Sequence, residues 1–428
     1  MKKIYSGQSF LYRANGYNST VFEARMTQRI RGDSLETAVR NTAKRFPDMT
    51  QKLVEKDGSY YLHPDSVSLN AVPTKRLRTL GSMETGYHLI DVTFTGNIIR
   101  VAFHHALCDG MGAKDFLQTL LYYYCTERYQ RQFNNEEIHT LDEVIDPREF
   151  QEPLPSQPYQ VDRDAIKPMT TDGFQLPEST PEAVECCRTE ITVDQKEFVT
   201  LSKSHGATPA IMAAMLFSRS VLRQFPEANK PILCNMAADM RFAIDDAITR
   251  RNCTGSFYLP YSKDDEASGM AQVAANHRRL IAEQRSEDAA HQSVNNQIGL
   301  FTKLESMPSL EAKRQMMSMF DHLLLNTYVL SYVGRMRFND FGRFVKSVHM
   351  YSGGIKGLTI NMVAAGDSMT FDVLQGFEGE RYVQGFVREL QEQGLGCRVG
   401  DTLPCETGAD RSHVTAPRQA ERWYAVAQ

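Results

Sequence analysis

Residues 101–112 read VAFHHALCDGMG, and this stretch decides how the chain is interpreted. The apolar run over 97–105 predicts a β-strand, joined by a tight turn to another strand over 87–94. A short loop with two glycines follows, and apolar residues then recur at helical spacing over 116–124. The stretch is therefore a strand–loop–helix junction of an α/β domain.

The chemistry-bearing residues of this junction lie where the strand ends. Strand alternation places Phe103 and His105 on one face and His104 on the other. Burial on an apolar face disfavours imidazolium, so His105 keeps a neutral nitrogen that can accept a proton near pH 7. Asp109 lies close to a helix N-terminus, where the helix dipole favours its charge. Gly110 permits a backbone conformation that a side chain would hinder.

The two histidines and the aspartate have two other interpretations, a structural strand end or a metal site. Metal ligands must converge, whereas neighbouring histidines on a strand diverge, so we expect no metal at His104 and His105. The pattern HHxxxDG fixes four positions, and its chance occurrence in a chain of this composition is about one in a thousand. This low chance favours a functional interpretation.

Composition and charge exclude several classes of protein. The 428 residues are 42% hydrophobic and 23% charged, as in ordinary globular proteins. A formal net charge of −4 offers no basic surplus for binding nucleic acid or an anionic membrane. The longest apolar run, 210–217, is far shorter than the ~20 residues of a membrane span. The eight cysteines include no CxxC pair. We therefore expect reduced thiols, adjacent Cys186 and Cys187 included, in a cytoplasmic protein without a secretory signal.

The prolines divide the chain into two unequal parts. Seven of the 17 lie within 147–181, which predicts an extended linker. We expect an N-terminal unit over 1–146, a linker or crossover over 147–183, a second α/β series over 184–395 and a polar tail over 396–428. Because helices and strands interleave throughout, a layered α/β architecture is favoured over separate all-α and all-β domains.

HHxxxDG is the signature of the acyltransferases related to chloramphenicol acetyltransferase, and this chain resembles that family. The family includes the condensation domains of nonribosomal peptide synthetases, the alcohol O-acetyltransferases and the plant BAHD acyltransferases. Other segments are similar to the family in the same order: RFPDM at 45–49, SHGAT at 204–208, NMAADMR at 235–241, LSYVG at 330–334 and DFGRF at 340–344. The last segment matches the BAHD element in part, since an arginine and a phenylalanine replace its tryptophan and second glycine.

The resemblance implies a fold and a set of site residues. The fold is a pseudo-dimer of two chloramphenicol-acetyltransferase-like α/β subdomains, with mixed sheets and a central tunnel that holds the active site. His105 is implied to be the general base that deprotonates an acceptor as it attacks an acyl thioester. The resemblance gives structural roles at the active site to His104, Asp109 and Gly110, with Asp109 paired to Arg241 of the other half.

The implied activity is acyl transfer from acyl-CoA, or from an acyl-phosphopantetheine carrier, to a hydroxyl or amine. These thioesters are co-substrates, and no bound cofactor is expected. Because thioesters are activated, a positioned base and oxyanion support suffice. Ser331 is a candidate for orienting an oxyanion or substrate, or else a strand hydroxyl bonded locally. The alternative function is a non-catalytic, condensation-like module that binds an acyl carrier protein or an amphipathic ligand.

Overall fold

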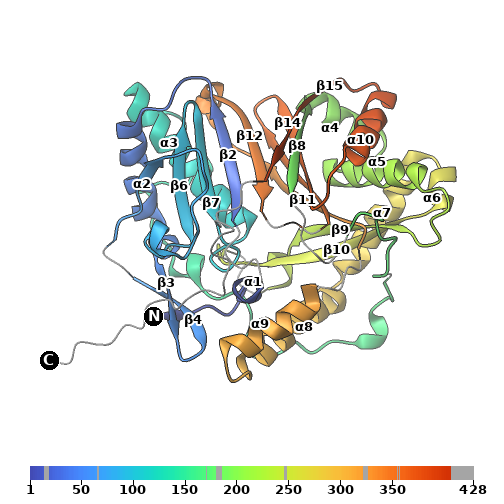
Figure 1. The fold of residues 1–428 in the computed structure, drawn as a ribbon, viewed down its shortest axis with the longest axis horizontal. Coiled ribbons are helices and arrows are strands. Elements are labelled where there is room, and N and C mark those ends of the chain that lie inside the picture. Colours follow the sequence, from blue (N-terminus) through green and yellow to red (C-terminus); the bar gives the residue numbers. More distant parts are fainter. Residues whose placement is uncertain are drawn as a thin grey trace.

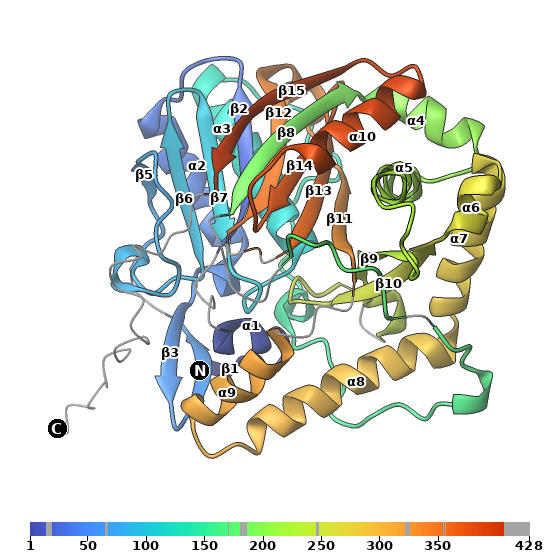
Figure 2. The ribbon, with the colours of Figure 1, turned by 45° about the vertical axis from the view of Figure 1, so that its right-hand side comes forward.

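The computed structural model describes residues 1–13, 19–64, 67–169, 171–179, 186–244, 248–321, 326–353, 355 and 357–405. Parts of the expected linker, and residues 406–428 of the expected tail, lie outside the described residues. The expected α/β architecture is confirmed. Two mixed sheets lie side by side, and each carries helices on the side that faces away from the other (Figures 1 and 2).

The sheet built mainly from the N-terminal half, called the first sheet, has the strand order β12-β2-β7-β6-β5 in the described chain. Its strands are Thr20–Met26 (β2), Ala71–Pro73 (β5), Ile90–Thr95 (β6), Ile98–Phe103 (β7) and Val345–Ser352 (β12). Helices Gly32–Arg45 (α2) and Gly110–Tyr129 (α3) cover its outer face (Figure 1). Ile99, Val101 and Phe103 are fully buried, as the strand alternation predicts.

The second sheet has the order β10-β9-β11-β13-β14-β8-β15 in the described chain. Its strands are Cys187–Asp194 (β8), Ile232–Asp239 (β9), Thr254–Tyr261 (β10), Tyr328–Arg335 (β11), Leu358–Ala365 (β13), Ser368–Gln375 (β14) and Cys397–Pro404 (β15). Strand β11 runs parallel to both of its neighbours, β9 and β13. The outer face is covered by Gln195–Ser204 (α4), Pro209–Gln224 (α5), Met270–Gln284 (α7) and Arg381–Glu392 (α10) (Figure 2).

Two segments extend the sheets in ways that the sequence pattern does not indicate. Strand β12 belongs to the second half of the chain but pairs with β2 in the first sheet. The expected polar tail begins with β15, which pairs antiparallel with β8 at the edge of the second sheet. Strand β12 therefore ties the two halves together, and β15 lengthens the second sheet.

A disulfide joins Cys186 to Cys405, which corrects the expectation that all cysteines are reduced. The antiparallel pairing of β15 with β8 brings the two residues together, with Cα atoms 5.2 Å apart. Cys187, the neighbour of Cys186, is a free thiol. Cysteine chemistry therefore no longer supports the expected cytoplasmic location.

Several of the remaining elements lie below the two sheets in Figure 1. They comprise a small antiparallel sheet of Lys2–Lys3 (β1), Lys52–Lys56 (β3) and Ser59–His63 (β4), and the helices Ser9–Tyr12 (α1), Glu287–Glu305 (α8) and Leu310–Asp321 (α9). The short helix Lys263–Ala267 (α6) follows β10 and lies near α7 (Figure 1). Helix α1 packs against α9, which positions the N-terminal segment beside the motif loop. Within the described residues, every helix is too short or too polar to cross a bilayer.

Candidate active site

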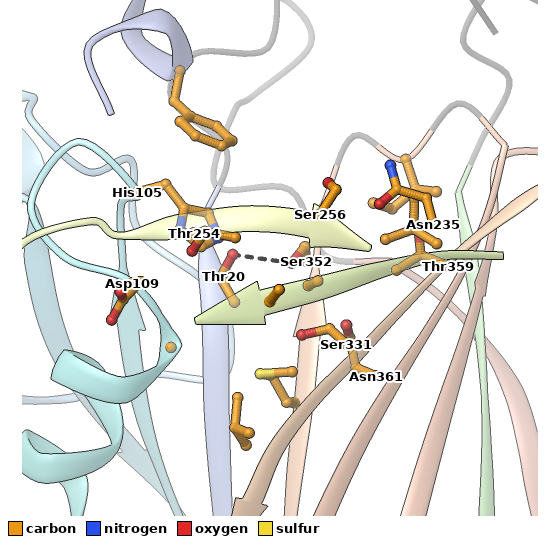
Figure 3. Close-up of a pocket in the computed structure, with 18 of the residues that line it drawn as sticks. Thr20, His105, Asp109, Asn235, Thr254, Ser256, Ser331, Ser352, Thr359 and Asn361 are labelled. Atoms are coloured by element: carbon orange, nitrogen blue, oxygen red, sulfur yellow. Dashed lines mark hydrogen bonds between the residues drawn. The ribbon is translucent and has the colours of Figure 1, made fainter. Parts of the chain in front are cut away.

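A cavity of about 600 Å³ lies between the two halves. The first half contributes α1, the start of β2 and the loop after β7, and the second half contributes β9, β10, β11 and β13, with crossing strand β12 between them. His105 and Asp109 lie at one side of this cavity, and a set of hydroxyl and amide side chains lies across from them (Figure 3).

His105 is placed in the cavity by the end of β7. Its ring lies 4.8 Å from the ring of Phe10 and 5.6 Å from that of Phe103, centroid to centroid. Its Nδ1 is buried and has no hydrogen-bond partner among the described residues. Burial, and after it the nearby Arg13 guanidinium, lower the pKa of His105 from 6.5 to about 4. The imidazole is therefore neutral at pH 7 and able to accept a proton.

His104 has a different task, as its opposite orientation predicts. Its side chain is buried, and its Nδ1 accepts a hydrogen bond of 3.0 Å from the Ala106 amide. Its own amide donates to the Leu89 carbonyl at 2.9 Å. His104 thus shapes the turn that presents His105.

Asp109 and Arg241 make the expected contact across the two halves. The Asp109 carboxylate accepts bidentate hydrogen bonds from Arg241 at 2.8 and 3.2 Å. The same carboxylate caps α3 by accepting from the Met111 and Gly112 amides at 3.1 Å each, and it accepts from the Cys253 amide at 3.0 Å. Asp109 therefore binds the motif loop to the segment between β9 and β10.

That segment in turn supports His105. Arg241 donates to the carbonyls of Thr249 at 2.8 Å and Arg251 at 3.0 Å, which fixes the path of the chain there. Asn252 then donates through Nδ2 to the His105 carbonyl at 2.8 Å. Asp109 therefore supports His105 indirectly. It binds Arg241, Arg241 fixes the main chain at Thr249 and Arg251, and the adjoining Asn252 holds the His105 carbonyl. Sequence reasoning missed Asn252, which carries no motif.

At two glycines the chain lies so close to its neighbours that a side chain would not fit. A Cβ on Gly7, whose φ is +71°, would lie 2.3 Å from the His105 carbonyl oxygen. A Cβ on Gly110 would lie 2.9 Å from Val333 Cγ1 of the other half. Gly110 begins α3, so its lack of a side chain matters for space rather than for an unusual backbone angle, which corrects our expectation. Gly7 was missed because nothing around it in the sequence marks it.

Ser331 lies on β11 with its side chain at the cavity (Figure 3). Its hydroxyl makes no hydrogen bond to another described residue, so the local-bond interpretation does not hold. Asn361 lies directly opposite on β13 and also lines the cavity. Nearby, the hydroxyls of Thr20 and Ser352 lie 3.0 Å apart. The structure thus gathers His105, Ser331 and uncharged polar groups around one space.

A second buried group of charges lies where β2 and β12 face β8 and β14, outside the cavity. We call it the sheet cluster: Glu23, Arg25, Arg100, Arg188, Glu190, His349 and Asp372. Potential metal-ligand atoms of Glu190, His349 and Asp372 lie within 4.8 Å of one another. Arg188, however, lies 2.7 Å from both Glu190 and Asp372, so a cation already sits among these carboxylates. The cluster is an ion-pair network between the two sheets.

No protein-family model matches the chain, and no curated protein matches it. Solved structures do match. TRI101 of F. graminearum, crystallised with coenzyme A and T-2 mycotoxin, is 11% identical and covers 90% of this chain and 96% of its own, with a TM-score of 0.59. The first condensation domain of the CDA synthetase is 12% identical, with coverages of 92% and 95% and a TM-score of 0.59. The trichothecene 15-O-acetyltransferase TRI3 of Fusarium sporotrichioides is 11% identical, with coverages of 91% and 94% and the same TM-score.

The chain has the fold of these proteins. The match extends over nearly the whole length on both sides, so the two halves correspond to one folded unit of that type. The α/β fold with two subdomains that the resemblance implies is thereby confirmed. At 11–12% identity the likeness concerns the fold, and the chemistry rests on the site.

Proposed function

We propose that this protein is an acyltransferase that moves an acyl group from a CoA or phosphopantetheine thioester to a hydroxyl or amine. The observation that carries the proposal is His105: a neutral, buried imidazole in a cavity between two halves, supported through its main chain by Asp109, Arg241 and Asn252. Structures of the same fold include an acetyltransferase and a protein crystallised with coenzyme A, which supports the same class of reaction.

The proposed reaction needs one base and no covalent enzyme intermediate. His105 takes the proton of the acceptor O–H or N–H as that atom attacks the thioester carbonyl carbon. The new C–O or C–N bond forms, the C–S bond breaks, and the proton passes from His105 to the leaving thiolate. In this proposal Ser331, which lines the same cavity, donates its hydroxyl proton in a hydrogen bond to the carbonyl oxygen as its charge develops.

A thiol-release assay tests the proposal. Purified protein is incubated with acyl-CoA donors and acyl-pantetheine against a panel of alcohols and amines, and intact-mass measurement identifies the acylated product. We expect at least one pair to react, and His105→Ala to lower the rate by about 10²–10⁴-fold. Equal rates for wild type and His105→Ala with every reactive pair would contradict the assignment of the base.

The alternative function is a non-catalytic module that binds a carrier protein or an amphipathic ligand. The same purified protein distinguishes this function from acyl transfer. Pull-down of an acyl carrier protein combined with absent turnover for every donor would favour it. A binding module does not require a neutral imidazole whose Nδ1 is left without a partner in a cavity, which is why we favour catalysis.

A further inference from the structure

The cavity wall across from His105 is polar, although it is built from central strands of a sheet. Along β9, β11 and β13 alternate side chains face the cavity, while their neighbours, such as Leu330, Ile360 and Met362, are buried beneath the helices. The cavity-facing set contains the residues that we call the polar wall: Asn235, Ser331, Thr359 and Asn361. Such positions in a sheet interior are ordinarily apolar, so the polar side chains need an explanation.

The residues of the polar wall are neighbours across the sheet. Val329 on β11 lies opposite Asn235 on β9 and Thr359 on β13. One step along the same face, Ser331 lies opposite Asn361. Figure 3 shows Ser331 and Asn361 close together beneath Asn235 and Thr359. Ser331 and Asn361 are therefore direct neighbours, whereas the apolar Val329 stands between Asn235 and Thr359.

Asn361 is the residue of this wall whose hydrogen bonding is unsatisfied. Its side chain is 4% exposed, and its Nδ2 has no partner among the described residues. A buried donor without a partner costs about 1–3 kcal/mol, so native proteins rarely keep one. Because the amide lines the cavity, an oxygen atom of a bound molecule can supply the missing acceptor.

The charges around the cavity indicate what kind of molecule fits this wall. The charged side chains among its described lining residues are Asp109 and Asp239, which both pair with Arg241, and Arg13. Arg13 lies against the Phe10 ring beside His105 and not in the polar wall. Asp372, opposite Asn361 on β14, is held by Arg188 and is fully buried. None of the polar-wall residues is charged. A charged ligand group would lose its hydration there without gaining a counter-charge, which is costly.

We propose that the polar wall binds an uncharged, oxygen-bearing segment of a substrate, and that Asn361 determines specificity by donating a hydrogen bond to a carbonyl or hydroxyl oxygen of that segment. This deepens the proposed acyl transfer and rests on it. Two substrates can supply such a segment: a neutral hydroxylated acceptor, or the amide-bearing pantetheine arm of the thioester donor. The chemistry is shared, and kinetics separates the two sources.

The test compares Asn361→Leu and Asn361→Asp with wild type, using Met362→Leu as the matched control. Met362 is the next residue on the same strand, but it faces the core, so its replacement perturbs β13 without changing the cavity. With a reactive donor–acceptor pair, we expect Asn361→Leu to raise the KM of one substrate about tenfold while kcat stays within about threefold. A rise in the acceptor KM assigns the wall to the acceptor, and a rise in the donor KM assigns it to the pantetheine arm.

Binding gives a readout that does not depend on turnover. Thermal-shift titrations of wild type with pantetheine, with neutral glycosides and with carboxylated glycosides of equal size should show stabilisation by a neutral compound and none by its charged analogue. Asn361→Leu should abolish that stabilisation, and Met362→Leu should keep it. The proposal is overturned if both KM values are unchanged in Asn361→Leu, or if neutral and charged probes bind wild type equally. If no pair reacts at all, the proposed function fails, while these titrations still decide the polar wall.

Discussion

Among the buried groups of charges at which the two halves of the molecule meet, two behave differently. At the motif cluster, defined as Asp109 and Arg241, one ion pair joins α3 to the segment after β9 and lies beside the cavity. At the sheet cluster, Arg25 of β2 binds Glu190 of β8, and His349 of β12 lies 3.2 Å from Asp372 of β14. Both clusters hold the halves together by arginine–carboxylate contacts.

The difference lies in what remains unpaired. In the sheet cluster the arginines Arg25, Arg100 and Arg188 are matched by Glu23, Glu190 and Asp372, and none of these residues lines the cavity that holds His105. By contrast, His105 and Asn361 line the cavity, and His105 Nδ1 and Asn361 Nδ2 are buried without a hydrogen-bond partner among the described residues. Buried ion pairs therefore show how the halves are held, whereas unpaired polar atoms at a cavity show where a ligand is handled.

The largest expected effect separates the two buried histidines. His105→Gln should lower kcat about 10²–10⁴-fold and leave the free energy of unfolding nearly unchanged, because Nδ1 of His105 makes no hydrogen bond to a described residue that would be lost. His349→Gln should keep kcat within about threefold and lower the stability by about 1–3 kcal/mol, because the contact with Asp372 is disturbed. Thiol release and urea unfolding of both variants measure this. A His349 variant that loses as much turnover as the His105 variant would remove the distinction.

The next effect separates the two aspartates. Asp109→Asn and Asp372→Asn each remove a buried carboxylate from an arginine. Arg241 keeps Asp239 and Arg188 keeps Glu190, so the cost is at most about 3–5 kcal/mol. Asp109→Asn should also lose activity, because the support of His105 through Arg241 is weakened. Asp372→Asn should lose stability only.

Urea unfolding and thiol release per folded molecule check the aspartate pair. An unchanged urea midpoint in Asp109→Asn would count against the importance of its pairing with Arg241. Reduced turnover in folded Asp372→Asn would mean that the sheet cluster also shapes the site.

The disulfide provides a smaller effect on stability alone. Cys186→Ser should lower the free energy of unfolding by roughly 2–5 kcal/mol, since the bond closes a long loop in the unfolded chain. Cys187→Ser, which alters the adjacent free thiol, is the control and should change it little. Urea midpoints with and without reductant measure both. Equal midpoints for the two variants under oxidising conditions would argue against the bond.

The smallest effect concerns Arg13. Its guanidinium is the second cause of the low His105 pKa, after burial, so Arg13→Gln should raise that pKa from about 4 toward 6.5. The acid limb of kcat/KM should move to higher pH in Arg13→Gln and stay in place in Arg13→Lys, which keeps the charge. If the acid limb of kcat/KM moves equally in both variants, the packing of the Arg13 side chain rather than its charge lowers the His105 pKa.

Much of the fold follows from local sequence. The hydrophobic pattern predicts the β6–β7 hairpin and the helix after the motif, because alternation and helical spacing are local properties. The pairing of β12 with β2 and of β15 with β8 could not be predicted, because the partners lie far apart in the chain and strand pairing at that separation leaves no local signal. The disulfide between Cys186 and Cys405 depends on the second of these pairings.

The residues of the candidate site also fall into those that the sequence predicts and those that only the structure reveals. His105, Asp109, Arg241 and Ser331 follow from the motif and the resemblance, and the structure brings them to one cavity or its support. Asn361 was missed, although a signal exists: an amide in an otherwise apolar strand, two residues after Thr359, marks a polar face in a sheet interior. That the face lines a cavity is a property of tertiary packing, which strand periodicity alone does not reveal.

The pH dependence of kcat/KM for wild type tests the central claim, that a desolvated, neutral His105 is the base. The base must be unprotonated, so the rate is constant above its pKa and falls below it. With a hydroxyl acceptor, which does not titrate in this range, burial predicts a flat profile from pH 8 down to about 5.5 and a fall toward pH 4. A fall of about tenfold per pH unit beginning near 6.5 would contradict the account.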